Sequence, residues 1–126
     1  MFRLGEAYLI YAEASLRGGG GTPAEAEGYV DSLRVRAFGN TSHNIPAGTL
    51  TLDTLLAERG RELLWEGHRR TDLIRFGLFT GGTYLYGWKG GTELGAATDP
   101  KYDLYPLPAT EIVTNPNLKQ NPGYAP

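Results

Sequence analysis

The segment from Leu52 to Phe79 constrains the fold most, because it combines helical periodicity with the densest run of charge in the chain. Its leucines recur at the three-, four- and seven-residue spacing of an amphipathic α-helix. They are Leu52, Leu55, Leu56, Leu63 and Leu64. Thr51 is a suitable N-cap, and Asp53 in the first turn complements the helix dipole. We therefore expect a helix that is interrupted at Gly67, followed by a bend and a shorter helix beginning near Arg69.

Charges of both signs nearly balance along this segment, which predicts an ion-pair network. Glu58, Glu62 and Glu66 recur every fourth residue, so three carboxylates line one stripe of the helix and repel one another unless cations intervene. A bend would let Arg69 or Arg75 fold back onto this stripe, where planar guanidinium groups bind carboxylates bidentately. The predicted structural ion network comprises Glu58, Arg59, Glu62, Glu66, Arg69, Asp72 and Arg75.

The row of carboxylates next to a tryptophan also suggests a glycosidase acid/base pair, but the surrounding residues argue against catalysis. Glycosidases hold two carboxyl groups apart across a cleft at separations that the mechanism sets. Carboxylates in a row on one helix, surrounded by arginines, are expected to have lowered pKa values and to donate protons poorly. The sequence therefore favours a structural network and predicts that the chain is not an enzyme.

The composition is that of an ordinary globular domain and excludes several functional classes. The chain has 126 residues, 40% of them hydrophobic, and a net charge of −2, so one domain over residues 1–126 is expected. It has no basic patch for nucleic acid and no run of eighteen apolar residues to span a bilayer. Cysteine is absent, His43 lacks a companion ligand, and His68 is interpreted as part of the charged bend, so we expect no metal site; no cofactor motif is present.

Two further helices are expected before this segment. Residues 1–17 follow helical spacing rather than the pattern of a signal peptide, and four glycines from Gly18 to Gly21 end that helix. Thr22-Pro23-Ala24-Glu25 is a capping box with proline at the first helical position, and it begins a helix that closes at Gly39-Asn40. Helices joined by such a short glycine turn are expected to pack antiparallel.

Residues 80–103 form a long loop that combines six glycines with large aromatic side chains. Tyr84, Tyr86 and Trp88 are spaced two apart, so their rings share one side if the segment is extended. Such a platform suits the apolar face of a sugar, and these three residues are the candidate ligand-binding residues; alternatively, the rings pack over the helices. Residues 104–126 are proline-rich and are expected to be extended, with one helical turn near residues 108–113.

Two groups of motifs resemble the SusD/RagB family. The first resembles the helix-bend-helix signature near that family's C-terminus: Glu58-Arg59, Glu62-Leu63, Glu66-Gly67-His68-Arg69 and Asp72-Leu73-Ile74-Arg75-Phe76-Gly77. The second resembles its closing segment: Tyr105-Pro106-Leu107-Pro108, Glu111-Ile112, Asn115-Pro116, Leu118 and Gln120-Asn121-Pro122-Gly123-Tyr124. Together they span residues 51–124.

The resemblance implies a mainly α fold, with tetratricopeptide-like helix pairs over residues 1–79 and an irregular, proline- and glycine-rich C-terminal wrap over residues 80–126. It implies non-catalytic binding of an oligosaccharide or another nutrient at the surface of the outer membrane, with a SusC-like TonB-dependent transporter as partner. Family members are longer lipoproteins, so the chain is expected to be a C-terminal fragment or an incomplete reading frame of a parent that reaches the membrane only through a lipid anchor. The alternative is a helical-repeat protein-interaction module without sugar affinity.

Overall fold

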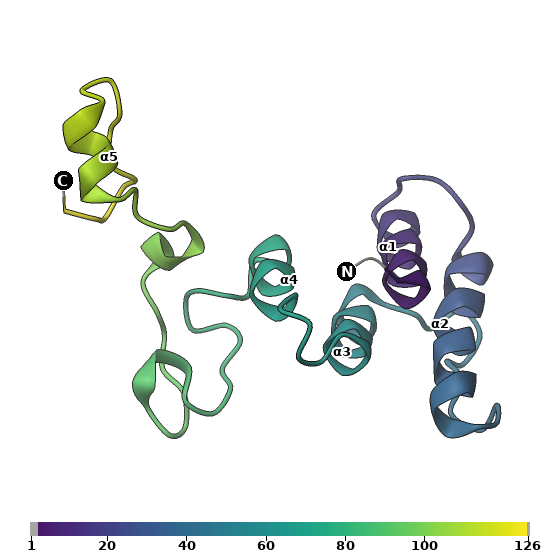
Figure 1. Ribbon diagram of the computed structural model, residues 1–126. Coiled ribbons are helices and arrows are strands. Elements are labelled where there is room, and N and C mark those ends of the chain that lie inside the picture. Colours follow the sequence, from purple (N-terminus) through teal and green to yellow (C-terminus); the bar gives the residue numbers. More distant parts are fainter. Residues whose placement is uncertain (1–2, 126) are drawn as a thin grey trace. The chain divides into compact units, whose positions relative to one another are not determined.

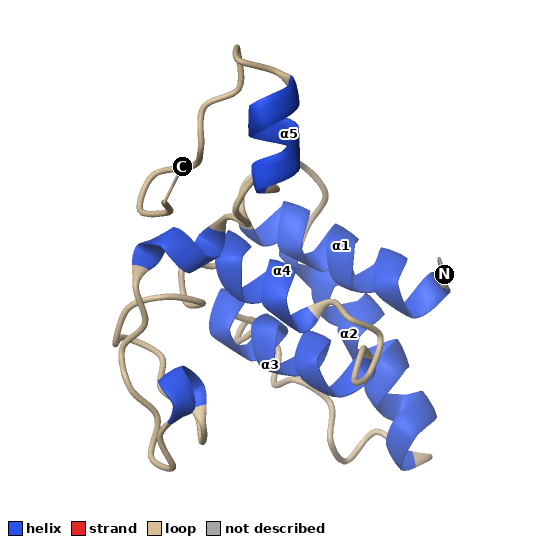
Figure 2. Ribbon diagram, turned by 60° about the vertical axis from the view of Figure 1, so that its left-hand side comes forward, coloured by secondary structure: helices blue, strands red, loops and turns tan. Residues whose placement is uncertain are grey.

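The computed structural model describes residues 3–125, and its regular elements are helices joined by turns and loops (Figure 1, Figure 2). Within that range the only extended pairing is an isolated bridge between Gly81 and Thr98. The predicted mainly α fold is therefore confirmed. The chain divides into two compact units, residues 1–69 and residues 70–126, each with its own internal packing.

The described part of the first unit contains α1 (Leu4–Leu16), α2 (Pro23–Phe38) and α3 (Leu52–Glu62). Figure 1 shows α1 and α2 side by side and running in opposite directions, as predicted. The ring of Tyr29 stacks on Tyr8 at 4.7 Å between centroids, and its centroid lies 4.9 Å from that of Tyr11 in a T-shaped arrangement. One core joins the three helices and the loop before α3: Leu9, Ala12, Ala26, Val30, Leu33, Ile45, Leu50, Leu55 and Leu63.

The ends of α2 and the start of α3 follow the capping signals in the sequence. Thr22 Oγ1 accepts from the backbone N–H of Glu25 at 3.2 Å, and the Glu25 carboxylate accepts from the backbone N–H of Thr22 at 3.0 Å, so the predicted capping box is confirmed. Gly39 ends α2 with φ 74°, a left-handed conformation that glycine adopts without steric penalty. Thr51 caps α3 through the backbone N–H of Thr54 at 3.2 Å.

The end of α3 differs from the prediction. The helix stops at Glu62, and residues 63–67 form turns in which Trp65 has φ 67° and Gly67 has φ 79°. Leu64 was expected on the apolar face, but 66% of it is exposed, whereas Leu63 is buried. Leucine spacing places both residues on the same face only while the backbone stays helical, and the left-handed residue that follows Leu64 ends that regularity.

The second unit contains most of α4 (Arg69–Arg75), the short 3₁₀ helices η1 (Lys89–Gly91) and η2 (Pro100–Asp103), and α5 (Ala109–Thr114). The expected short helix near residue 69 and the expected helical turn near residues 108–113 are confirmed. The boundary between the units falls at the first residue of α4. A single domain over residues 1–126, and the pairing of α3 with α4, stay predictions.

The C-terminal tail returns to the segment before α5 through side-chain hydrogen bonds. Gln120 accepts from the N–H of Leu107 at 2.8 Å and donates to its carbonyl at 2.9 Å, as a second strand would. Asn121 donates to the carbonyl of Tyr105 at 2.7 Å. The hydroxyl of Tyr124 donates to the carbonyl of Leu104 at 2.9 Å. These bonds hold Tyr124 beside residues 101–105.

Candidate functional site

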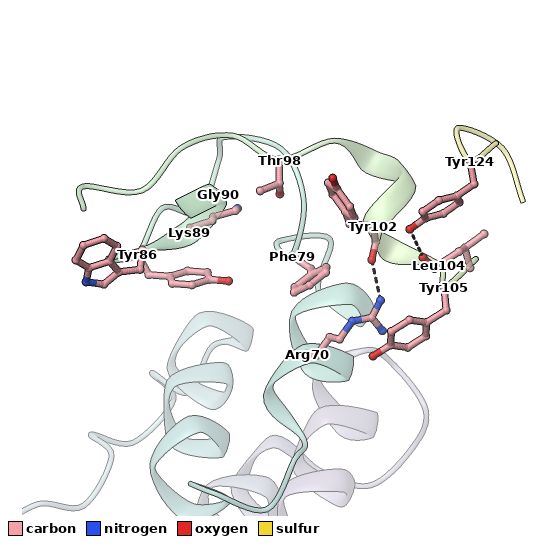
Figure 3. A pocket seen from close by; sticks show the side chains of 11 residues that line it. Arg70, Phe79, Tyr86, Lys89, Gly90, Thr98, Tyr102, Leu104, Tyr105 and Tyr124 are labelled. Atoms are coloured by element: carbon pink, nitrogen blue, oxygen red, sulfur yellow. Dashed lines mark hydrogen bonds between the residues drawn. The ribbon is translucent and has the colours of Figure 1, made fainter. Parts of the chain in front are cut away.

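A pocket of about 300 Å³ lies within the second unit (Figure 3). Its lining combines six aromatic rings, Phe79, Tyr86, Trp88, Tyr102, Tyr105 and Tyr124, with Arg70, Lys89, Gly90, Thr98 and Leu104. We call this site the aromatic pocket. Three stretches supply it: α4 with the residues after it, the glycine-rich loop, and the η2 region together with the returning tail. A mostly apolar lining with a few polar groups is typical of small-molecule sites.

Arg70 is held in the aromatic pocket by two rings. Its guanidinium carbon lies 4.0 Å from the ring centroid of Tyr105 and 5.0 Å from that of Phe79, within the range of cation–π attraction. Nη2 also donates to the carbonyl of Tyr102 at 2.7 Å. Figure 3 shows the guanidinium beside the ring of Tyr105, with its hydrogen bond to Tyr102 as a dashed line. These contacts fix the plane of the guanidinium group.

Lys89 stabilises the glycine-rich loop from within. Only 3% of this lysine is exposed, and its Nζ donates to the carbonyls of Tyr84 at 2.7 Å and Leu78 at 3.4 Å. Burial of an ammonium group without such acceptors would be costly. Nζ also lies 5.8 Å from the ring centroid of Tyr86. Lys89 therefore joins the residues after α4 to the loop that carries Tyr86 and Trp88.

Gly95 permits a close backbone approach within the same loop. Its φ is 81°, and a Cβ at this position would lie 2.5 Å from the carbonyl oxygen of Tyr86, closer than real Cβ contacts. Only glycine fits there without displacement of the backbone. The approach closes the loop around η1 and sets the position of Tyr86 at the pocket.

Two of the three predicted ligand-binding residues line the aromatic pocket. Tyr86 and Trp88 do so and are exposed, Trp88 to 71%, whereas Tyr84 is not among the lining residues. The ring of Tyr84 lies 5.9 Å from that of Tyr86 in a tilted arrangement. The segment is not extended throughout, because Trp88 has φ 69° and begins a 3₁₀ turn. Binding of a ligand by Tyr84, Tyr86 and Trp88 stays a prediction.

Sequence reasoning missed most of the other lining residues, among them Arg70, Phe79, Tyr102, Tyr105 and Tyr124. They are separated by up to 54 positions in the chain. What brings them together is the polar contacts of the tail, through Gln120 and Asn121, and the stacking of Arg70. Neither produces a periodic pattern. The one available signal was the accumulation of tyrosines around two prolines at residues 100–106.

The carboxylate stripe on α3 is paired mainly with arginines from other segments. Glu58 lies 3.0 Å from Arg34 Nη2 and 2.5 Å from Arg61 Nη2. Glu62 lies 2.6 Å from Arg36 Nη2 and 2.6 Å from Nη1 of Arg3, the residue that precedes α1. Sequence reasoning missed Arg3, Arg34 and Arg36 as partners, because packing of the first two helices and the residue before α1 against α3 creates these pairs. Arg61 pairs with Glu58 within α3 itself.

Glu66 was predicted as the third carboxylate of the stripe, but it lies in the turns after α3, because the helix ends at Glu62. Arg3 Nη2 lies 2.7 Å from it. The hydrogen bond from Arg3 holds the pKa of Glu66 below its ordinary value, and the same bond raises the pKa of Arg3. A lowered pKa agrees with the expectation for carboxylates near arginines. It disfavours Glu66 as a proton donor.

The remaining members of the predicted network have structural contacts of their own. Arg69 donates from Nη1 to the carbonyl of Leu56 at 2.9 Å, and Arg75 pairs with Asp72 at 2.9 Å within α4. Asp72 and Arg59 are both buried. A structural role for these seven residues as one network stays a prediction.

Residues 3–125 contain no group of three metal-binding side chains, whether histidine, aspartate or glutamate, close enough to hold an ion. None of the helices in that range has the length and apolar character needed to cross a bilayer.

Comparisons with known proteins place the chain in a family. The sequence model of the SusD family matches residues 1–124. The starch-binding protein SusD of Bacteroides thetaiotaomicron is 44% identical to the chain, and SusD-like protein P2 of Formosa agariphila is 38% identical. The alignments cover 98% and 97% of this chain but 21% and 25% of those relatives, so the chain spans about a fifth to a quarter of their length.

Comparison with a solved structure supports the same family at the level of the fold. A SusD superfamily protein from Bacteroides vulgatus matches with a TM-score of 0.78 and 35% identity, over 99% of this chain and 28% of that one. The curated relative is named for binding rather than for catalysis, in agreement with the prediction that the chain is not an enzyme. The chain belongs to the SusD family.

Proposed function

We propose that the chain is part of a glycan-binding protein and that its aromatic pocket contacts the sugar. Membership of the SusD family supports glycan binding, since a relative with 44% identity is named a starch-binding protein. The observation that assigns sugar binding to this pocket is the exposure of Trp88, which lines the pocket and is 71% exposed. An indole ring offers a flat apolar face, which suits the apolar face of a sugar.

The neighbours of Trp88 support the same proposal. Tyr86, Tyr102, Leu104 and Tyr105 also line the pocket and are all exposed. Contiguous exposed apolar groups of this kind are uncommon on soluble proteins unless a ligand or partner covers them. Tyrosine hydroxyls add hydrogen-bond donors and acceptors next to the apolar surface, and sugars require both.

The setting of this activity is a further part of the proposal. By its family, the protein acts at the surface of the outer membrane in nutrient uptake, through a lipid anchor and with a SusC-like TonB-dependent transporter as partner. The antiparallel α1 and α2 serve as one tetratricopeptide-like pair of its scaffold.

A protein-interaction module without sugar affinity is the second candidate, and one observation favours it. Trp65 is 95% exposed and follows the exposed Leu64 in the turn after α3, which is outside the aromatic pocket. Such a turn suits contact with a protein. Binding to an array of neutral, uronic-acid and sulfated oligosaccharides separates the two candidate functions. A protein-interaction module is expected to bind none of these oligosaccharides.

The decisive experiment compares Trp88→Ala with Trp65→Ala in the full-length protein. The two tryptophans are a matched pair, since both are exposed and both have a left-handed backbone, with φ 69° and 67°. Covering roughly 80 Å² of an indole contributes about 2 kcal/mol, or about 30-fold in affinity. Calorimetric titration with the best oligosaccharide from the array is expected to show this loss for Trp88→Ala and no change for Trp65→Ala. Equal affinities of the two variants, with folding intact, would contradict the assignment.

A further inference from the structure

We propose that the sugar bound in the aromatic pocket carries a negative charge, as a uronic-acid carboxylate or a sulfate ester, and that this charge pairs with Arg70. The inference rests on the proposed function and adds the class of ligand. It is carried by two observations: Arg70 has no carboxylate partner within residues 3–125, and the pocket lining has no acidic side chain.

The charge of Arg70 is not neutralised within the described chain. Its Nη2 donates to the carbonyls of Tyr102 at 2.7 Å and Asp103 at 3.5 Å, and its Nε and Nη1 donate to no group in residues 3–125. No carboxylate in that range forms an ion pair with it. By contrast, Arg34 and Arg61 each reach a carboxylate within 3.0 Å. The sequence has 14 acidic residues against 12 basic ones, so acidic groups are not scarce.

The lining of the pocket has positive charges only. Arg70 and Lys89 contribute to it, and no aspartate or glutamate does. Asp103 is not among the lining residues: its Oδ2 accepts from Thr80 Oγ1 at 3.0 Å, and its buried Oδ1 has no hydrogen-bond partner within residues 3–125. Lys89 is buried and donates to carbonyls, so it adds to the positive potential without reaching the ligand. Apolar walls strengthen such a potential by lowering the local dielectric.

The stacking of Arg70 on aromatic rings orients its guanidinium group for binding an anion. Figure 3 shows its guanidinium between the aromatic side chains of the pocket, and the rings of Phe79 and Tyr105 hold its plane. A group fixed in this way loses less conformational entropy when it binds. A guanidinium group is also more weakly hydrated than an ammonium group and pairs well with carboxylates and with oxyanions such as phosphate. Stacking surfaces beside a cation suit an acidic sugar better than a neutral one.

The test measures affinities of the full-length protein for three oligosaccharides of equal length: a galacturonate tetramer, a sulfated tetramer and neutral maltotetraose. A hydrogen bond to a charged group corresponds to about 10- to 100-fold in affinity. We expect one of the acidic tetramers to bind tighter than maltotetraose by this factor. The preference is expected to shrink as sodium chloride is added, since salt screens partly exposed charges. Comparison of the two acidic tetramers separates the carboxylate from the sulfate.

Variants assign the preference to Arg70. Arg70→Gln is expected to remove the preference for the acidic tetramer, and Arg70→Lys to retain part of it. Lys119→Gln is the matched control, because it removes an exposed positive charge of the same unit outside the pocket lining. Circular dichroism checks that each variant is folded. If Arg70→Gln is unfolded, two other results test the inference: the acidic preference is expected to be partly retained in Arg70→Lys, and that of the wild type is expected to shrink with added salt.

The outcomes distinguish this inference from the proposed function. Equal binding of all three tetramers, weakened by Trp88→Ala, would overturn the inference and leave the proposed function in place. An acidic preference that persists in Arg70→Gln would also overturn it. Absence of binding to every tetramer and to the array would contradict both.

Discussion

Removal of Arg34 is expected to destabilise the first unit more than removal of any exposed arginine around α3. Its Nε and Nη2 both donate to Glu58 Oε2, at 3.1 and 3.0 Å, and its Nη1 donates to the carbonyl of His43 at 2.7 Å. The side chains of Arg34 and Glu58 are 17% and 8% exposed. Arg34→Ala therefore leaves a nearly buried carboxylate with one partner fewer.

The magnitude follows from what remains at Glu58 after the substitution. Breaking a buried ion pair from one side costs about 3 to 5 kcal/mol, because a buried charge is left uncompensated. Arg61 still lies 2.5 Å from Glu58 and offsets part of that cost. We expect Arg34→Ala to lower the free energy of unfolding by about 2 to 3 kcal/mol.

Arg61→Ala is the matched control, since it removes a second arginine from the same carboxylate oxygen. The side chain of Arg61 is 57% exposed, and exposed pairs contribute about 0 to 1 kcal/mol. Urea unfolding followed by far-ultraviolet circular dichroism measures both variants, and a double-mutant cycle with Glu58→Gln isolates the pair of Arg34 and Glu58. Equal losses for Arg34→Ala and Arg61→Ala, or a coupling energy near zero, would refute the reasoning.

Three further predictions concern helix capping, a lowered pKa and the glycine-rich loop. Thr22→Ala removes the capping box of α2 and is expected to lower the unfolding free energy by about 1 kcal/mol, measured by urea unfolding; no change would mean that the cap is redundant. Arg3→Ala removes the hydrogen bond that lowers the pKa of Glu66, so an NMR titration is expected to give Glu66 a higher pKa than in the wild type. Because the pKa of Glu66 is lowered in the folded state, the stabilisation it provides is present above its unfolded pKa and is lost as pH falls through its folded pKa. Gly95→Ala places a Cβ against the carbonyl of Tyr86 and is expected to weaken sugar binding while α1 to α3 keep their amide shifts; unchanged affinity would show that the loop tolerates the displacement.

Local signals in the sequence were sufficient for most of the helices. The capping box at Thr22, the glycines after α1 and the apolar spacing of α3 act within a few residues, so they can be recognised without tertiary information. The exception was the end of α3, where Trp65 adopts a left-handed conformation although it is not glycine. Intrinsic preference gives no indication of such a residue, because a residue with a bulky side chain rarely adopts a positive φ.

The candidate site could be predicted only in part. Tyr86 and Trp88 were identifiable because they are concentrated in one glycine-rich loop, whereas Tyr105 and Tyr124 reach the pocket through hydrogen bonds between distant segments. The ion pairs, too, could be predicted only in part. The carboxylates of α3 were evident from their four-residue spacing, but Arg3 and Arg34 pair with them only after the helices pack.

The central claim, that the aromatic pocket binds sugar through Trp88, is tested most directly by fluorine NMR on protein labelled with fluorotryptophan. The chain contains two tryptophans, and only Trp88 lines the pocket. Trp88→Phe and Trp65→Phe assign the two resonances by their disappearance. Titration with the oligosaccharide that binds best on the array is predicted to shift the Trp88 resonance in a saturable way and to leave that of Trp65 unchanged. An unshifted Trp88 resonance at a concentration that saturates binding by calorimetry would contradict the account.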